Sequence, residues 1–457
     1  MPQKPKRTTF HKRLSHMVAT LRDDIITGKL ASGDYLPSET ALADEFTLSK
    51  NSVRKGLELL VSEGLIEKIP RVGTRIRDLS LENTVMLRLG YYPSLIEDSD
   101  LYQLIAMFHE RHHHIRVQMI PLSVTSYHET VTHYFEHRMV DLVTVNHENF
   151  LQLEEKGAVE LLEPVAVNPE IYPFLNNAFT SGGKLRVQPF IFSPVVLCYD
   201  KEYFAERNIP EPDSSWTWDT LLSYAHQLIN EEKPFGFYFH LPSRNRWPIF
   251  LHQSGMRFSR RPNGKFKLQG TPFRESLERC RNLIYSQNNA YSFVSEKDAD
   301  AERLFLQRKV PMIMTTYFNL NALSEAKFPF ELAPLPYIEV PKTLLLSIGL
   351  AVHRDSTQKE AAKCFVDFCS SWEAQSFIRK STYSIPSLKK AAEWQGKEQL
   401  YRPSRYHMYR EIIPSFSWLS DLRLTTTDFY HLEDELRFYW SRLEDIDETC
   451  RRLEEVL

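Results

Sequence analysis

Residues 48–60, LSKNSVRKGLELL, combine basic and hydrogen-bonding side chains with an apolar stripe. Lysine, arginine, asparagine and serine are the side chains that read base edges and hold phosphates in duplex DNA. Val53, Leu57 and Leu60 recur at helical spacing, which predicts a helix with its polar residues outside. The alternative is a solvated surface helix whose charges serve solubility. The neighbouring elements decide between the two.

The preceding segment predicts a shorter helix and a tight turn. A first helix is expected over residues 10–27, followed by GDYLPSETALADEF at 33–46. Pro37 cannot lie inside a helix, and Ser38 is a good N-cap for a helix that begins after it. Ser49 is the corresponding cap for the next helix. Two short helices joined in this way predict a helix-turn-helix.

The segment after the basic helix, LIEKIPRVGTRIRD at 65–78, predicts a small hairpin that turns at Gly73. Arg71, Arg75 and Arg77 surround that turn. A helix-turn-helix followed by a basic hairpin is a winged helix, in which the second helix reaches base edges and the wing meets phosphates.

Charge is divided unequally along the chain. Residues 1–80 hold 14 basic and 10 acidic side chains, a net charge of +4, whereas the whole chain carries −3 and the remainder therefore −7. A basic head on an acidic body indicates a polyanionic partner for the head alone.

The stretch GDYLPSETALADEFTLSKNSVRKGLELLVSEGLIEKIPRVGTRI resembles the winged-helix domain of the GntR family of bacterial transcription regulators, over about residues 10–78. The family usually has arginine where Thr40 and Lys50 stand, so its base preference is not carried over. The residues at which the resemblance implies DNA contacts are Ser38, Thr40, Lys50, Asn51, Ser52, Arg54, Lys55, Arg71, Gly73 and Thr74.

Strands and helices alternate after residue 84, as in TVMLRLGYY, DLYQLIAMFHERHH, IRVQMIPL and YHETVTHYFEHRM. This alternation predicts a mainly parallel sheet covered by helices, with ligands bound beyond the carboxyl ends of the strands. It places Tyr91, Tyr92 and residues 146–148 at the rim of one cleft.

Several segments in collinear order, among them LCYDKEYFAERNIPEPDSSWTWDTL, LFLQRKVPMIM and EAAKCFVDFCSSWEAQ, resemble the carbohydrate-type solute-binding proteins of ABC importers. The resemblance covers residues 84–457 and implies two α/β lobes with a hinged ligand cleft. The predicted fold is therefore multidomain. A winged helix-turn-helix of the α+β class occupies residues 1–79, and a two-lobed α/β domain of periplasmic-binding-protein type II occupies residues 80–457.

A sugar site pairs stacking aromatic rings with hydrogen-bonding groups. By position in the resemblance, the expected ligand residues are Tyr91, Tyr92, Asn146, His147, Trp247, Tyr317, Ser347 and Gly349. Tyr317 is the foremost of these because it follows the VPMIMT strand. In a chain with 21 tyrosines and 7 tryptophans, the alternative for each ring is a packing role.

No catalytic residue, cofactor or metal is expected. No sequence motif of a hydrolase, kinase or nucleotide-binding loop occurs, and HERHHHIR at 109–116 is interpreted as a solvated helix end. The five scattered cysteines and the lack of a signal peptide favour a cytoplasmic protein, and no apolar run is long enough to cross a membrane.

The C-terminus carries an apolar 3-4 repeat from Phe429 to Leu457. The family resemblance favours two helices broken near Ser441 that pack on a lobe. The alternative is a coiled coil that dimerises the chain.

We therefore expect a ligand-responsive transcriptional regulator, specifically a repressor, that senses a sugar or oligosaccharide. It should bind a palindromic operator in double-stranded DNA as a homodimer, without a membrane partner. Ligand binding would close the lobes and change operator affinity. Two alternatives are a winged helix fused to an aminotransferase-like, pyridoxal-phosphate-binding body and an exported transporter component. The first lacks a recognisable Schiff-base lysine segment, and the second requires export.

Overall fold

The computed structural model describes residues 13–14, 17–18, 20–22, 24–25 and 29–456, except 78–83, 124–125, 288–294 and 398–399. The chain divides into two compact units. Unit 1 comprises residues 1–144, 160–164 and 350–374, and unit 2 comprises residues 145–159, 165–349 and 375–457. The winged helix and the first strands of the α/β region therefore belong to the same unit.

The head of unit 1 is the predicted winged helix. Helix α2 (Glu39–Glu45) begins at Ser38, whose Oγ accepts from the Ala41 amide at 3.2 Å. Helix α3 (Lys50–Ser62) begins at Ser49 in the same way and buries Val53, Leu57 and Leu60. Both predicted caps are confirmed. The helix predicted over residues 10–27 lies partly outside the described residues, and those described between 13 and 25 are helical.

The wing is an antiparallel hairpin of β1 (Ile66–Ile69) and β2 (Gly73–Ile76), with Ile66 opposite Ile76. The segment before α2 runs along β2: the amides of Gly33 and Leu36 donate to the carbonyls of Ile76 and Thr74. The hairpin predicted from the sequence is confirmed, with this extra edge in addition.

The α/β part of unit 1 follows the predicted alternation of strands and helices. Strand β3 pairs in parallel with β4, Leu87 opposite Val117, and with β5, Leu89 opposite Leu142. The elements of this part are β3 (Val85–Tyr91), α4 (Leu95–Ser99), α5 (Leu101–Arg111), β4 (Ile115–Pro121), α6 (Tyr127–Glu136) and α14 (Lys359–Cys369). Four elements extend across the boundary between the units: β5 (Leu142–Asn146), η1 (Ala158–Leu161), β11 (Thr343–Val352) and α15 (Trp372–Ser381).

Unit 2 is built around β8 (Gln188–Asp200), all of whose residues are buried. Strands β9 (Met312–Thr316) and β10 (Phe330–Ala333) pair antiparallel with β8. The other strands are β6 (Thr180–Ser181), β7 (Lys184–Leu185), β12 (Ile385–Pro386) and β13 (Phe416–Ser417). The helices are α7 (His147–Glu155), α8 (Pro173–Ala178), α9 (Lys201–Glu206), α10 (Trp218–Leu228), α11 (Pro248–Gln253), α12 (Phe273–Tyr285), α13 (Ala299–Leu306), η2 (Asn319–Leu323), α16 (Lys389–Ala392), η3 (Tyr406–Arg410), η4 (Ile413–Ser415), η5 (Leu419–Leu422), α17 (Thr426–Trp440) and α18 (Ile446–Val456).

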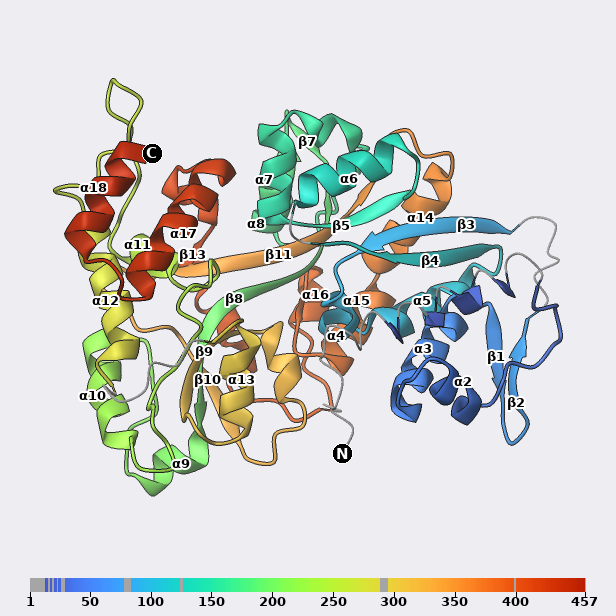
Figure 1. Cartoon of the computed structure of the whole chain (residues 1–457), viewed down its shortest axis with the longest axis horizontal. Helices are drawn as coiled ribbons and strands as arrows, with labels where there is room; N and C mark the ends of the chain where they lie inside the picture. Colours follow the sequence, from blue (N-terminus) through green and yellow to red (C-terminus); the bar gives the residue numbers. More distant parts are fainter. Residues whose placement is uncertain are drawn as a thin grey trace. The chain divides into compact units, whose positions relative to one another are not determined.

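The C-terminal 3-4 repeat forms two helices, as the family resemblance predicted. Helix α17 ends at Trp440 with Ser441 as its C-cap, and α18 begins at Ile446. The two pack against each other and α18 packs against α12 (Figure 1). Leu443 lies in the break and is 73% exposed. Leu457 is outside the described residues.

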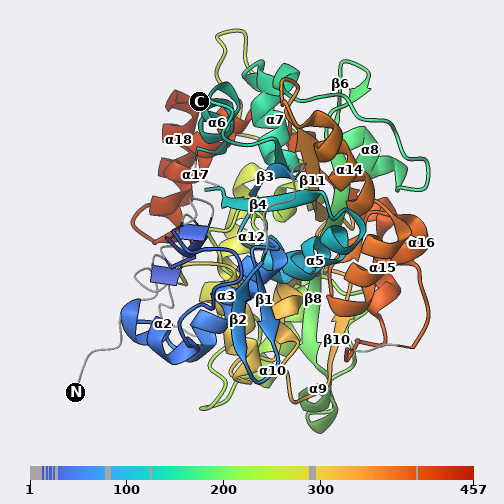
Figure 2. The ribbon, with the colours of Figure 1, turned by 90° about the vertical axis from the view of Figure 1, so that its right-hand side faces the viewer.

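The C-terminal end of α3 packs against α5, which joins the head to the α/β part within unit 1 (Figures 1 and 2). The backbone of Ser62 hydrogen-bonds the buried ring of His109, whose Nε2 accepts from the Val117 amide at 3.0 Å. Burial lowers the pKa of His109 to about 3, so the ring is neutral. The prediction of a solvated helix end is thus wrong for His109, which is needed for packing. It holds for the exposed His113 and His114.

Glu63, the residue after Ser62, is buried in an ion pair with Arg22. Nε of Arg22 lies 2.8 Å from Oε2 of Glu63. Tyr91 and Tyr102 hydrogen-bond each other, and both lie close enough to Glu63 to interact electrostatically with it. Burial raises the pKa of Glu63, and Arg22 opposes that rise. Removing one partner of such a buried pair costs about 3–5 kcal/mol. The Arg22–Glu63 ion pair therefore keeps two opposite charges buried where the head meets the α/β part.

Gly64 follows with a φ of +71°, the left-handed conformation that ends many helices. A Cβ at this position would lie 2.6 Å from Nε of Arg116, a residue of β4. The left-handed backbone favours glycine here, and any larger residue would also have to displace the Arg116 side chain.

Replacing Gly64 by alanine should lower the melting temperature of the transition that includes the head. A left-handed alanine costs about 1–2 kcal/mol, and the clash with Arg116 adds to that cost. Gly33→Ala is the matched control, because its φ is +89° but nothing lies within 4 Å of its Cβ. Differential scanning calorimetry should show the larger decrease for Gly64→Ala. Equal decreases would contradict the contact with Arg116.

Candidate DNA-binding and ligand-binding sites

The first two turns of α3 present the predicted base-reading residues to solvent. Lys50, Asn51, Arg54 and Lys55 are all exposed, whereas the opposite face of the helix is buried in the head. Ser52 does not belong to this surface: it is 5% exposed, and its Oγ lies 2.6 Å from Oγ of Ser49. Its hydroxyl is used to start the helix.

The beginning of α2 lies beside this surface. Arg54 Nε donates to Glu39 at 2.8 Å, an exposed ion pair that fixes the guanidinium between the two helices. Ser38 and Thr40 are exposed on the same short helix or its cap. Seven of the residues predicted to contact DNA are exposed: Ser38, Thr40, Lys50, Asn51, Arg54, Lys55 and Arg71.

A hollow of about 750 Å³ separates the wing tip from the start of α2. Its lining includes the predicted Ser38, Arg71, Gly73 and Thr74. It also includes Tyr35 and Val72, which are 50% and 64% exposed and were missed from the sequence. The sequence feature that could have indicated Val72 is its place at the tip of a basic hairpin, where an apolar side chain has no hydrophobic core to pack into.

Tyr91 and Tyr92, predicted ligand residues, are both buried in unit 1. Tyr91 lies beside the Glu63–Arg22 pair, and burial raises its pKa to about 12. The Tyr92 amide donates to Thr144 Oγ1 at 3.0 Å, and its ring is 5.4 Å from that of Tyr127. In this structure Tyr91 contributes to the junction with the head.

In unit 2, Asn146 and His147 start helix α7. Asn146 Oδ1 accepts from the Asn149 amide at 2.7 Å. His147 is 8% exposed, and its ring centroid lies 4.2 Å from that of the half-buried Trp418. Burial lowers the pKa of His147 to about 4. An aromatic ring thus lies beside polar groups at the N-terminus of a helix.

Trp247 and Tyr317 are fully buried in the core of unit 2. Trp247 stacks on Phe429 with centroids 5.3 Å apart. The Tyr317 hydroxyl donates to the Tyr406 carbonyl at 2.8 Å, and its amide donates to Ser193 Oγ at 2.7 Å. Both rings are used for packing in this structure, which was the alternative left open for them.

Ser347 and Gly349 lie on β11 against β8. Ser347 Oγ donates to the Ile191 carbonyl at 3.1 Å. A Cβ on Gly349 would lie 2.5 Å from the Gln188 carbonyl oxygen, so this position requires glycine for the approach of the two strands.

Two further residues of unit 2 have the chemistry of a sugar site and were missed from the sequence. Trp418 contacts His147, and the 39% exposed Tyr430 accepts from Gln152 at 2.8 Å. Arg244 lies over the Tyr430 ring and is ion-paired with Glu148 and Glu433. Tyr430 and Trp418 lie more than 260 residues after α7 in the sequence. Only the three-dimensional structure shows that they contact this helix.

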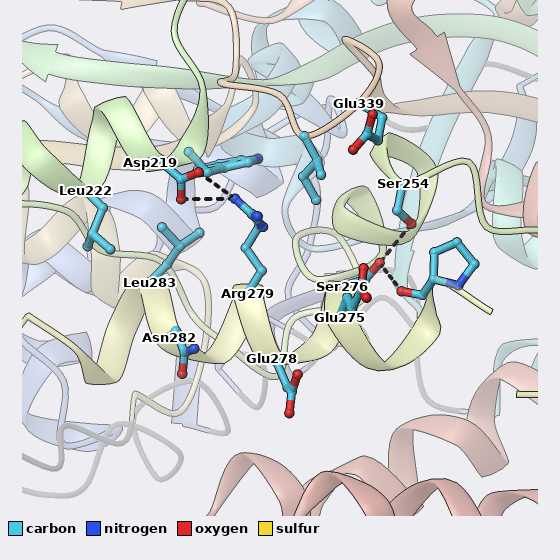
Figure 3. A pocket seen from close by; sticks show the side chains of 13 residues that line it. Asp219, Leu222, Ser254, Glu275, Ser276, Glu278, Arg279, Asn282, Leu283 and Glu339 are labelled. Carbon is cyan, nitrogen blue, oxygen red and sulfur yellow. Dashed lines mark hydrogen bonds and ion pairs between the residues drawn. The ribbon is translucent and has the colours of Figure 1, made fainter. Parts of the chain in front are cut away.

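A separate groove of about 520 Å³ lies between α10 and α12 of unit 2 (Figure 3). It is lined by Asp219, Glu275, Glu278 and Arg279, and Arg279 is ion-paired with Asp219 at 3.0 Å. None of the predicted ligand residues lines it, and Trp218, the aromatic residue in its lining, is fully buried.

Across the described residues, no group of three His, Cys, Asp or Glu side chains is arranged to hold a metal ion. Among the helices in the described part of the chain, none has the length and apolar character needed to cross a membrane.

Residues 92–376 match the model of the bacterial extracellular solute-binding protein family, and residues 14–76 match that of the gntR family of bacterial regulatory proteins. The chain belongs to the bacterial extracellular solute-binding protein family, with a GntR-type winged helix at its N-terminal end. These families are of non-enzymatic kinds. The aminotransferase-like alternative is set aside because residues 92–376, where such a body would lie, match the solute-binding family.

Two regulators of Escherichia coli K12 are similar to the head. The mannosyl-D-glycerate system repressor MngR is 39% identical over 69 residues, 15% of this chain and 29% of the regulator. The HTH-type regulator YieP is 32% identical over 77 residues, 17% of this chain and 34% of the regulator. The chain thus spans about a third of the length of either.

The body is similar to transport proteins. The sn-glycerol-3-phosphate-binding periplasmic protein UgpB of Shigella dysenteriae is 21% identical over 333 residues, 65% of this chain and 76% of UgpB. Lmo0181 of Listeria monocytogenes, solved with cycloalternan, has a TM-score of 0.67 at 17% identity over 81% of this chain and 97% of its own. The maltotriose-binding protein of Thermus thermophilus has a TM-score of 0.64 at 19% identity, over 81% and 98%. These structures establish the two-lobed fold.

Tyr317→Phe should reduce stability by about 1 kcal/mol because it removes the buried hydrogen bond that the Tyr317 hydroxyl donates to the Tyr406 carbonyl. It should leave saccharide affinity unchanged. Trp418→Leu should have the opposite effect: it should lower saccharide affinity and leave the stability of the protein nearly unchanged. Calorimetric melting and titration with a saccharide that binds the wild type separate the two effects. A Tyr317→Phe variant that melts normally but loses affinity would restore Tyr317 as a ligand residue.

Proposed function

We propose that this chain is a transcriptional repressor whose operator binding responds to a saccharide held by its solute-binding domain. The observation that carries the proposal is the packing of α3 on α5. The helix that presents Lys50 and Asn51 is supported at its other end by the solute-binding domain, so a ligand that alters this domain acts on the support of the DNA-reading surface.

A saccharide is favoured by the chemistry near α7. The aromatic rings of Trp418 and Tyr430 and the polar groups of Asn146 and His147 are the combination that sugar rings require. Cycloalternan and maltotriose, bound by two of the structural relatives, belong to the same chemical class. The proposed ligand residues are therefore Asn146, His147, Trp418 and Tyr430.

We further propose a homodimer that acts in the cytoplasm on a palindromic operator. A single α3 covers one short stretch of the major groove, and two heads on half-sites about one helical turn apart double the contacts. The GntR-type head and the similarity to MngR, a repressor, support this part of the proposal.

Lys50→Ala or Asn51→Ala should each weaken specific DNA binding by roughly five- to a hundredfold, because each removes a base-edge or phosphate contact worth about 1–3 kcal/mol. The matched control is Lys29→Ala, which removes an exposed lysine of the head that is ion-paired with Asp24. Fluorescence anisotropy with a duplex chosen by in vitro selection measures the change. Equal affinity of all three variants would refute α3 as the reading helix.

The proposed coupling is tested in two stages on the full chain. Saccharides are first screened for those that raise the melting temperature, since a ligand of the native state stabilises it by mass action. Operator affinity is then measured with and without each stabilising saccharide. A repressor released by its effector should bind at least several-fold more weakly when saturated. Unchanged affinity with every stabilising saccharide would refute the coupling.

A further inference from the structure

A groove of about 610 Å³ lies between the wing and the α/β part, entirely within unit 1. The head contributes Gly64, Glu67, Arg75 and Arg77 to its lining, and the chain around β4 contributes His113 and Arg116. We call it the wing groove. It shares no residue with the hollow at the wing tip or with the candidate saccharide residues.

Cationic side chains outnumber anionic ones in the wing groove. Three arginines face one described carboxylate, Glu67, which is already 2.6 Å from Arg75 and 3.8 Å from Arg77. One carboxylate shared by two guanidinium groups cannot neutralise a third. Among the described residues, the groove therefore has an excess of positive charge.

Arg116 is the buried member of this set, with only 9% of its surface exposed. Its Nη1 donates to the Ile115 carbonyl at 3.1 Å, and no carboxylate among the described residues lies within ion-pair distance. A guanidinium has five donors, and burying its charge without an anion is costly. Burial, and secondarily the charge of Arg77, lowers the pKa of Arg116.

We infer that the wing groove binds a phosphate group, carried by a small phosphorylated molecule. Guanidinium groups pair with phosphate through two parallel hydrogen bonds, and arginine clusters are a common phosphate-binding arrangement. The space is sufficient for a phosphorylated metabolite. A DNA backbone is the less fitting ligand, because a rigid duplex reaches a residue that is only 9% exposed less readily than a small molecule does.

Such a ligand would contact both sides of the junction at once. Arg75 and Arg77 belong to the wing and its continuation, whereas Arg116 belongs to β4 and covers Gly64. A bound phosphate would therefore strengthen the attachment of the head to the α/β part. This second effector site is independent of the proposed saccharide site.

The test uses the full chain and two probes without a sugar ring, inorganic phosphate and phosphoenolpyruvate, with chloride at matched ionic strength as reference. Both probes should raise the melting temperature of the wild type. Arg77→Gln should weaken their binding by roughly ten- to a hundredfold, since it removes one charge-assisted pair. Arg111→Gln is the control, because this exposed arginine of unit 1 is ion-paired with Glu373 outside the groove.

Arg116→Lys gives a second variant that keeps the charge but loses the paired donors, and it should also bind the probes more weakly. Equal stabilisation of the wild type by phosphate and chloride would overturn the inference, as would equal phosphate affinity of wild type and Arg77→Gln. If selected duplex DNA displaced the probes competitively, the groove would be a contact for the DNA backbone and the small-molecule site would be refuted. No saccharide enters these assays, so their outcome is separate from that of the saccharide proposal.

Discussion

The structure depends on the packing of three consecutive residues at the end of α3 on the solute-binding domain. The backbone of Ser62 hydrogen-bonds His109, and Glu63 is buried in an ion pair with Arg22 beside Tyr91. Gly64 has no side chain, and the Arg116 side chain occupies the space beside it. Each contact is specific in a different way, by hydrogen bonding, by charge and by shape. A helix fixed at one end by such contacts presents its other end to DNA at a defined place on the domain.

This constraint gives a physical reason for fusing a DNA-binding head to a solute-binding domain. In a flexibly tethered head, ligand binding would change only the distance over which the head can diffuse. In this chain the head packs on α5 of the domain, and Gly64 lies against the Arg116 side chain of β4. Under the proposed coupling, a change in this surface would be transmitted to α3 through packed atoms.

Much of the fold followed from local patterns in the sequence. The caps at Ser38 and Ser49, the hairpin at Gly73 and the break at Ser441 each depend on residues close together in the chain. The candidate sites followed less well, because they depend on contacts between distant residues. Tyr317 and Trp247 have the composition of sugar-binding rings but are buried, whereas Trp418 reaches His147 from 271 positions away. Burial and long-range pairing leave no signature in a short segment.

The most direct test of the central claim is the distance between the head and α5 in solution. Spin labels are placed at Lys55→Cys on α3 and Glu110→Cys on α5, both exposed, in a Cys364→Ser background diluted with unlabelled protein. A docked head predicts one narrow distance distribution in double electron–electron resonance. The Gly64→Ala variant should broaden it. A broad distribution in the otherwise unmodified chain would show that the head is merely tethered and would contradict the account.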